Sequence, residues 1–212
     1  MSGGMPYRAC WWIARVLCKA LLRLKVSGAS QVPGVGGVIL ASNHRCYADP
    51  VIIGASTRRE LHFLAKSEAF GWFVIGPLIR ILNALPIRRS AAGLNALTSV
   101  EDTLKHEEAV LMFPEGTRKR HAIQLGEPKP GVGLLAARTG VPIVPLYISG
   151  TCRISRSLLG RDRVEVRFGQ PVRPEEFTVI GDQKETYRRI TAEVMRRIQD
   201  IQQRQGGGPS AG

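Results

Sequence analysis

The chain has 212 residues, of which 44% are hydrophobic, so it can bury a substantial core but is short for two full domains. Its 30 lysines and arginines outnumber its 17 aspartates and glutamates, and the formal charge of +13 favours phosphate-bearing partners such as nucleic acid, anionic lipid or a phosphorylated cofactor. The four cysteines form neither a CxxC pair nor a metal-ligand spacing, and we find no cleavable secretory signal, so we expect a reducing cytosolic setting and no metal site.

The first predicted element is an amphipathic helix within residues 6–25. Its apolar side consists of Cys10, Ile13, Val16, Leu17, Ala20, Leu21 and Leu24. An adjacent basic arc consists of Arg8, Arg15, Lys19 and Arg23, with Trp12 inside it. Such a helix lies in a membrane interface, apolar side down, with basic side chains at the phosphates and Trp11 at the headgroup level. The alternative is a helix that packs on the protein's own core.

Strands and helices alternate along the rest of the chain. Apolar runs predict strands at 37–43, 61–65, 84–89, 109–114 and 163–170. Helical spacing predicts helices at 91–106 and 131–139, and a stripe of Tyr187, Ile190, Val194, Ile198 and Ile201 predicts a last helix that docks on the outside of the sheet. This order predicts an α/β fold with a largely parallel central sheet flanked by helices.

Two of the apolar runs have features of their own. In residues 163–170 apolar and charged residues alternate, which predicts a strand near a sheet edge. Residues 142–149 contain two prolines, so we expect an irregular wall beside a ligand there and not a regular central strand.

The stretch LASNHRCYADPVII, residues 40–53, brings together residues suited to proton transfer. The imidazole of His44 can accept a proton from an alcohol at neutral pH if a carboxylate holds its tautomer. Asp49 can do so if it caps a helix with Pro50 at the first helical position, while the loop folds His44 back onto it. The alternative is that Asp49 only caps the helix and His44 is an ordinary loop histidine.

A second segment, FPEGTRKR at 113–120, follows an apolar run and so lies at the carboxyl end of a strand, where ligands bind in open α/β sheets. The guanidinium of Arg118 and the amides of Gly116 and Thr117 are suited to a phosphate. The alternative is a surface turn with incidental charge. Arg88 and Arg89, in ALPIRRS, form a cationic pair that could reach the same crevice or simply end a strand in solvent.

Residues 131–136, GVGLLA, have the outline of a dinucleotide-binding glycine motif. They follow EPKP and not a strand, and no acidic partner stands at the expected distance downstream. We therefore interpret Gly131 and Gly133 as the start of a helix.

Four segments, NHRCYADP, PIRR, FPEGTR and VPIVP, span residues 43 to 145 in this order. They resemble the four sequence blocks of the glycerolipid acyltransferase family, whose best-known members are the lysophosphatidate acyltransferases. Two details depart from the commonest pattern. Cys46 stands where many members carry a serine or another small polar residue, and Arg88 is an extra arginine beside Arg89, which we take as the match.

The resemblance implies transfer of a fatty acyl group from a thioester, acyl-coenzyme A or acyl carrier protein, to a hydroxyl of a lysophospholipid. The commonest acceptor is 1-acylglycerol-3-phosphate, which gives phosphatidate, and acceptance of another lipid is the alternative. The resemblance also implies that His44 is the general base and that Asp49 is its partner. The expected phosphate-binding residues are Arg89, Glu115, Gly116, Thr117 and Arg118. The chemistry needs no metal, no permanently bound cofactor and no covalent nucleophile, although Cys46 leaves a thiol mechanism as an alternative.

We thus expect a membrane-surface helix over 1–30, a single acyltransferase domain over 31–204 and a disordered tail over 205–212. The expected location is the cytoplasmic side of a membrane rich in anionic lipid, with Lys129 in the loop 119–131 reaching the acceptor's phosphate. The competing hypothesis is a basic α/β nucleic-acid-binding module. We expect no nucleic acid as partner, because the aromatic residues are only 6% of the chain and are not interleaved with basic ones.

Overall fold

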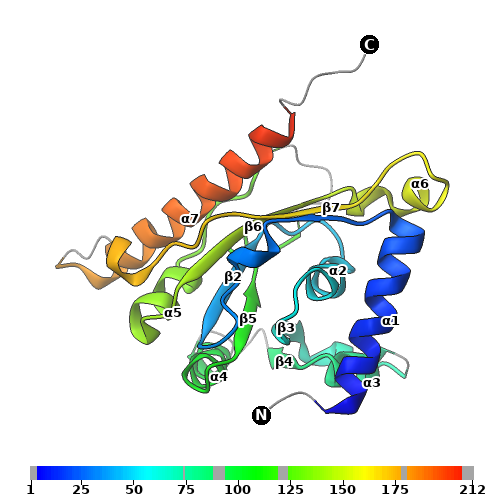
Figure 1. Cartoon of the computed structure of the whole chain (residues 1–212). Coiled ribbons are helices and arrows are strands. Elements are labelled where there is room, and N and C mark those ends of the chain that lie inside the picture. Colours follow the sequence, from blue (N-terminus) through cyan, green and yellow to red (C-terminus); the bar gives the residue numbers. More distant parts are fainter. Residues whose placement is uncertain (1–3, 74, 88–93, 119–123, 178–180, 207–212) are drawn as a thin grey trace.

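A seven-stranded sheet in the order β1-β7-β6-β2-β5-β3-β4 forms the centre of the molecule (Figure 1). The computed structural model describes residues 4–73, 75–87, 94–118, 124–177 and 181–206. Its strands are β1 (Lys25–Ser27), β2 (Val38–Ser42), β3 (Leu61–Lys66), β4 (Ala84–Ile87), β5 (Ala109–Met112), β6 (Ile143–Ser149) and β7 (Glu165–Phe168). All neighbouring strands pair in parallel except β6 and β7, so the predicted largely parallel α/β fold is confirmed.

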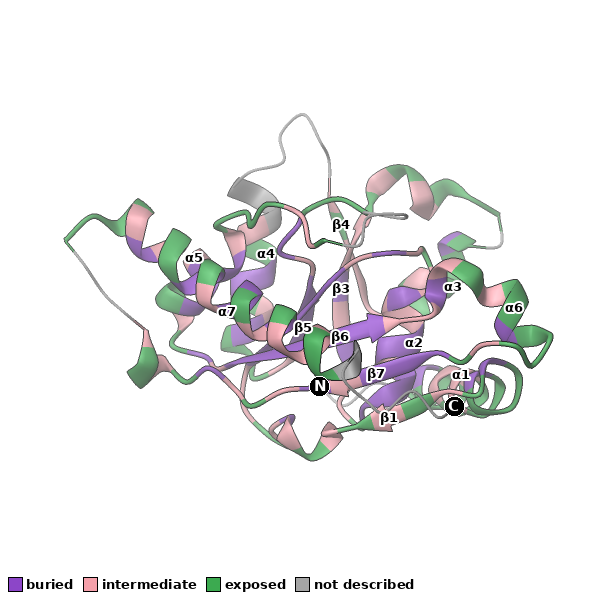
Figure 2. Ribbon diagram, turned by 90° about the horizontal axis from the view of Figure 1, so that it is seen from above, coloured by how far each residue is buried: buried purple, intermediate pink, exposed green. Residues whose placement is uncertain are grey.

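Helices cover both faces of this sheet (Figures 1 and 2). They are α1 (Met5–Leu22), α2 (Asp49–Ser56), α3 (Ile75–Ile81), α4 (Leu94–Lys105), α5 (Gly131–Thr139), α6 (Ile154–Leu158) and α7 (Gln183–Gly206). One core contains residues of α1 and α2, and a second core, on the other face, contains residues of α4, α5 and α7. The last helix thus docks on the sheet as predicted and extends to Gly206, while residues 207–212 lie outside the described part.

Strands β2 and β5 lie side by side in the middle of the sheet, and every residue in them is buried. Alternate side chains enter the two cores, with Leu40 on the α2 side and Ile39 on the α5 side. A strand that is covered on both faces has a continuous apolar sequence, which is why these runs were recognisable. Because the two strands are parallel, the loops after Ser42 and Met112 leave the sheet at the same edge.

The prediction of an irregular segment at 142–149 is wrong, because Ile143–Ser149 form the regular strand β6 between β2 and β7. Leu146 pairs with Phe168 whereas Ile143 bridges to Val172, so the chain beyond β7 contains one more residue than β6 over this interval. This β-bulge lies opposite Pro145, whose carbonyl accepts a hydrogen bond from Gly169 N at 2.8 Å. A proline without an N–H group is tolerated at a bulge. The strand β7 lies one position in from the β1 edge, as its alternation predicts.

The helix α1 packs on the core through a face that the sequence pattern did not reveal. Tyr7, Cys18 and Leu22 are buried, and Trp11 Nε1 donates to the carbonyl oxygens of Gly54 (3.0 Å) and Thr57 (2.9 Å) at the end of α2. The Arg15 guanidinium donates to the Ala55 carbonyl at 2.9 Å. Trp11 and Arg15 therefore satisfy the carbonyl groups at the carboxyl end of α2, contacts that the sequence pattern did not predict.

The predicted apolar side of α1 remains largely in solvent. Ile13 is 60% exposed, Val16 51%, Leu17 49% and Leu21 50%. The helix thus packs on the protein's own core, as the alternative for residues 6–25 proposed, and leaves an apolar face uncovered. Its position in a membrane interface stays a prediction. In the described part of the chain, no helix has the length and apolarity needed to cross a bilayer.

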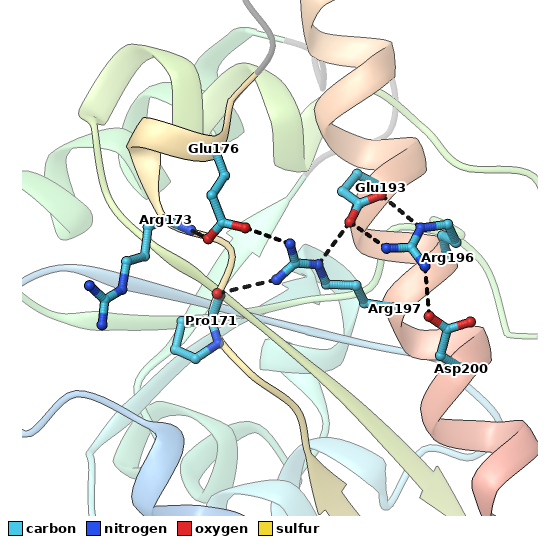
Figure 3. Close-up of polar contacts among 7 residues, drawn as sticks. All are labelled: Pro171, Arg173, Glu176, Glu193, Arg196, Arg197 and Asp200. Carbon is cyan, nitrogen blue, oxygen red and sulfur yellow. Dashed lines mark hydrogen bonds and ion pairs between the residues drawn. The ribbon is translucent and has the colours of Figure 1, made fainter.

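A network of arginines and carboxylates attaches α7 to the loop before it (Figure 3). Arg197 donates to Glu176 at 2.6 Å, to Glu193 at 2.8 Å and to the Pro171 carbonyl at 3.3 Å. Glu193 also accepts two hydrogen bonds of 2.8 Å from Arg196. The network ties the helix to the segment that follows the β-bulge.

Candidate active site

His44 and Asp49 lie together in the loop that leaves β2. The Nδ1 atom of His44 is 3.0 Å from Oδ2 of Asp49, which also accepts the backbone amides of Arg45 at 2.6 Å and Cys46 at 2.7 Å. Because this oxygen is already an acceptor for two N–H groups, Nδ1 must be the donor in the third bond. The neutral imidazole thus carries its proton on Nδ1 and a lone pair on Nε2, the tautomer that a general base requires.

The start of α2 differs in one detail from the sequence-based expectation. The helix begins at Asp49 itself, with Ala48 as its N-cap and Pro50 as the following residue. The Asp49 side chain makes no capping bond and turns back into the loop before the helix. Its carboxylate therefore organises the residues 44–46 and does not only start the helix, which argues against the alternative in which Asp49 is merely a cap.

The ring of His44 is held from one side by Phe113, the first residue after β5. The two rings stack with centroids 3.9 Å apart and an interplanar angle of 16°. Asp49 is fully buried, whereas the His44 side chain keeps an exposed fraction of 17%. The imidazole is therefore fixed in orientation and still accessible to a substrate.

Glu115 joins the loops of the first and third sequence blocks. It is buried, and its Oε1 accepts the backbone amide of His44 at 3.1 Å while its Oε2 accepts that of Gly126 at 2.9 Å. Both oxygens thus hold protein backbone. Direct binding of a phosphate by Glu115 stays a prediction, and the observed bonds make it a residue that positions His44.

The segment 113–118 forms a tight turn that ends in exposed residues. The Gly116 amide donates to the Phe113 carbonyl at 2.9 Å, and Gly116 has a φ of +65°, a left-handed conformation that favours glycine. A Cβ at Gly116 would lie 2.8 Å from Cδ and 3.1 Å from Nζ of Lys129, so the lysine lies directly on this turn. Its contact with the acceptor's phosphate stays a prediction. Gly116 and Thr117 are exposed.

Arg118, also exposed, connects this turn to the first block. Its guanidinium carbon lies 3.3 Å from the centroid of the Tyr47 ring, three residues after His44. A guanidinium that stacks on an aromatic ring keeps its N–H edges available for phosphate oxygens. The structure thus brings His44, Asp49, Glu115, Gly116, Thr117 and Arg118 to one edge of the sheet. Arg88 and Arg89 lie outside the described residues.

Asn43 is a structural residue of the site that the sequence analysis missed. Its buried side-chain amide donates to the Ile148 carbonyl at 3.0 Å and accepts the Ile148 amide at 2.8 Å. These two bonds continue the pairing of β2 with β6 by one residue and fix the position from which His44 departs. Its place directly before the histidine is the only sequence signal for this role, and the partner becomes visible only in three dimensions.

Residues 23–149 match the protein-family model described as Acyltransferase, which covers more than half of the chain and contains all of these site residues. The chain belongs to the acyltransferase family. The resemblance of its four sequence blocks to glycerolipid acyltransferases is thereby confirmed.

Two relatives of this acyltransferase family member are both named 1-acyl-sn-glycerol-3-phosphate acyltransferase. The protein from Bacillus subtilis is 24% identical over 197 residues, which is 92% of this chain and 96% of the relative. The protein from Streptococcus pneumoniae is 30% identical over 147 residues, which is 68% of this chain but only 53% of the relative.

A solved structure has the same fold. The 1-acyl-sn-glycerophosphate acyltransferase PlsC from Thermotoga maritima superposes with a TM-score of 0.71 at 23% sequence identity, over 92% of this chain and 79% of that protein. The largely parallel α/β fold of this chain is therefore also found in a solved structure.

Proposed function

We propose that the protein transfers a fatty acyl group from an acyl thioester to the free hydroxyl of a lysophospholipid, and that its preferred acceptor is 1-acylglycerol-3-phosphate. The observation that carries the proposal is the hydrogen bond from His44 Nδ1 to Asp49 Oδ2, which leaves Nε2 as a base next to a turn suited to a phosphate. The relatives named 1-acyl-sn-glycerol-3-phosphate acyltransferase support this choice of acceptor.

In the proposed reaction Nε2 of His44 accepts the hydroxyl proton as the acceptor's oxygen attacks the thioester carbonyl carbon. The tetrahedral intermediate then collapses, the carbon–sulfur bond breaks, and the imidazolium returns its proton to the leaving thiolate. The products are the new ester and a free thiol, so atoms and charges balance without a covalent enzyme intermediate. Acyl-coenzyme A and acyl carrier protein would both fit this scheme as donors.

The neighbours of His44 would act by holding it in position. Asp49 accepts the Nδ1 proton and places a negative charge next to the imidazolium that forms during attack. Phe113 fixes the plane of the ring, and Glu115 fixes the backbone of the same residue. We assign no nucleophilic role to Cys46, whose backbone amide is bound to Asp49.

The phosphate of the acceptor would bind at the turn after β5. Arg118 offers its guanidinium, Lys129 its ammonium group and Thr117 its backbone amide, whereas the amide of Gly116, also expected to bind phosphate, already donates to the Phe113 carbonyl within the turn. We propose Arg89, from the second block, as a further cation of this site. No metal or bound cofactor has a role in the proposal.

We further propose that the protein works on the cytoplasmic surface of a membrane, where its lysophospholipid acceptor would be found. The support is the apolar side of α1, on which Ile13, Val16, Leu17 and Leu21 are 49% to 60% exposed. Such a face, flanked by Arg8, Lys19 and Arg23, fits a peripheral or partly embedded position in a bilayer that contains anionic lipid.

The proposal is tested with purified protein, a panel of lysophospholipids, and acyl-coenzyme A or acyl carrier protein as donor, with release of the free thiol as the readout. We expect turnover with 1-acylglycerol-3-phosphate and its loss, by roughly 100-fold or more, in His44→Ala. His106→Ala is the matched control, because His106 is an exposed histidine at the end of α4. Equal loss of turnover in both variants would contradict the assignment of His44 as the base. Turnover with only a different lysophospholipid would show that this lipid, and not 1-acylglycerol-3-phosphate, is the acceptor.

A further inference from the structure

A second cationic site lies away from His44, where the end of α1, the helix α6 and the start of β7 meet. It is a surface pocket of about 570 Å³. The pocket is lined by Arg23, Gly150, Arg161, Asp162, Arg163, Glu165 and Arg167. None of these residues belongs to the proposed active site, so the pocket needs a separate explanation.

The acidic residues of this pocket are already paired. Glu165 is almost fully buried between Arg163 Nε at 2.6 Å and Arg167 Nη2 at 2.9 Å. Burial alone would raise the pKa of the Glu165 carboxyl, but the two arginines prevail and hold it below its usual value. Asp162 pairs with Arg156 at 2.7 Å. The acids therefore do not cancel the charge of the pocket.

The remaining two arginines provide uncompensated positive charge. Neither Arg23 nor Arg161 forms an ion pair with an acid in the part of the chain that the structure describes. One N–H group of Arg23 donates to the Gly160 carbonyl at 2.7 Å, which holds the loop after α6 against the end of α1. Two guanidinium groups that line one pocket and have no acid partner there form a site for a multiply oxygenated anion such as a phosphate.

The pocket adjoins an exposed apolar surface. Leu158 and Leu159, in and after α6, are 55% and 70% exposed, and α6 contacts α1. The helices α1, α3 and α6 lie along one side of the molecule in both views (Figures 1 and 2). Within the described residues, the exposed large hydrophobic residues other than Val35 and Tyr47 belong to α1, α3 and α6 or stand close to these helices in the sequence, as Trp72, Phe73 and Leu159 do. We call this set the apolar side.

We propose that the arginine pocket binds the phosphate of an anionic membrane phospholipid while the apolar side rests in the bilayer. The proposal rests on the membrane association put forward above and adds a defined headgroup site to it. Leu158 and Leu159 would enter the interface next to the bound lipid, and Arg161 and Arg23 would grip its phosphate. A phosphate group also occurs in coenzyme A, so the donor is the competing source of the same chemistry, and the test separates the two.

The test compares Arg161→Glu with Arg188→Glu, an identical charge change at an exposed arginine of α7. Binding to vesicles of phosphatidylcholine alone, or of phosphatidylcholine with phosphatidylglycerol, is measured by co-sedimentation. We expect Arg161→Glu to lower affinity for the phosphatidylglycerol vesicles roughly 10-fold or more, because the charge reversal removes one attraction to the anionic surface and adds a repulsion. Arg188→Glu should change the affinity for these vesicles far less. Arg161→Lys, which keeps the positive charge, should retain part of the affinity.

Three results would overturn the proposal. An equal loss in the two charge-reversed variants would mean that only net charge matters. A raised KM for acyl-coenzyme A in Arg161→Glu, with unchanged vesicle binding, would make the pocket a donor site. Failure of the unaltered protein to bind either kind of vesicle would contradict the proposed membrane association itself. Turnover with detergent-dispersed substrates tests the proposed acyl transfer separately, because that assay does not depend on the pocket. Arg161 is exposed and forms no ion pair with any residue that the structure describes, so the variant should fold, and a thermal unfolding curve checks this.

Discussion

One carboxylate oxygen organises the whole loop around His44. Oδ2 of Asp49 accepts three N–H groups, while Oδ1 is buried and has no partner among the described residues. An asparagine in this place can direct its own oxygen to the three donors and its amide to the vacant side. The loop can then keep its shape while the negative charge beside the imidazole disappears.

We therefore predict that Asp49→Asn lowers kcat by roughly 100-fold or more and leaves the folded state intact. The reason is that the imidazolium formed during proton transfer loses its counter-charge. The measurement is the rate of thiol release, with a thermal unfolding curve for each variant. Cys46→Ser is the control and should keep substantial activity, and a complete loss there would revive a thiol mechanism.

At the scale of helices, α5 and α7 approach so closely that one glycine has no room for a side chain. A Cβ on Gly133 would lie 2.1 Å from the Tyr187 carbonyl oxygen, and the Gly133 amide donates to the Thr191 hydroxyl at 3.0 Å. The motif at 131–136 is thus the start of a helix, as interpreted from sequence, and its second glycine serves helix packing.

Replacement of Gly133 by alanine should consequently lower the free energy of unfolding by about 2 kcal/mol or more, because backbone must move to admit the methyl group. Gly54→Ala in α2 is the matched change, since a Cβ there meets nothing within 4 Å. It should raise stability by about 0.5 to 1 kcal/mol. Urea unfolding of both variants measures the difference, and similar effects of the two substitutions would refute the packing argument.

The attachment of α7 also predicts a dependence on pH. The hydrogen bonds from Arg196 lower the pKa of Glu193 to about 2, with partial burial opposing them and Arg197 adding to them (Figure 3). A carboxyl whose folded-state pKa lies below its ordinary value of 4.5 stabilises the fold fully above that value, and the stabilisation is lost as the pH falls toward 2.

Glu193→Gln should therefore cost roughly 1 kcal/mol at pH 6 to 7, a modest value because the side chain is partly exposed, and almost nothing near pH 2. Urea unfolding at a series of pH values measures this difference. Glu185→Gln, which removes an exposed helix pair with Arg189, serves as control and should cost only a few tenths of a kcal/mol. A cost for Glu193→Gln that does not shrink with acid would contradict the assignment.

For the whole molecule, the positions of the charged and apolar residues on the surface matter more for membrane binding than their total numbers. The charge of +13 is spread over many exposed arginines, whereas the exposed apolar residues are concentrated on α1, α3 and α6. A surface of this kind has one orientation in which it can meet a bilayer with little loss of polar hydration.

In vesicle binding, Leu17→Gln should weaken the association by about 5-fold or more, because a half-exposed leucine on the apolar side would no longer enter the interface. Val35→Gln is the control, since Val35 is 84% exposed but lies outside that side. Both proteins should unfold at the temperature of the unaltered chain. Unchanged binding of Leu17→Gln would show that α1 does not face the membrane.

Local pattern was sufficient for the elements and for the chemistry of the two central loops. The continuous apolar runs of β2 and β5 predict buried parallel strands, because such strands are covered on both faces. The loops that follow them carry His44, Asp49 and Arg118 close to the strand ends, so their meeting at one edge could be expected from the parallel topology alone.

Only the tertiary structure decided what depends on partners far along the chain. Trp11 and Arg15 meet the end of α2, Glu115 holds the amide of Gly126, and the bulge beyond β7 accommodates Pro145 in the middle of the sheet. Each of these contacts satisfies a particular N–H or C=O group, and a sequence pattern records which side chains are polar or apolar but not which backbone group lies within 3 Å of them.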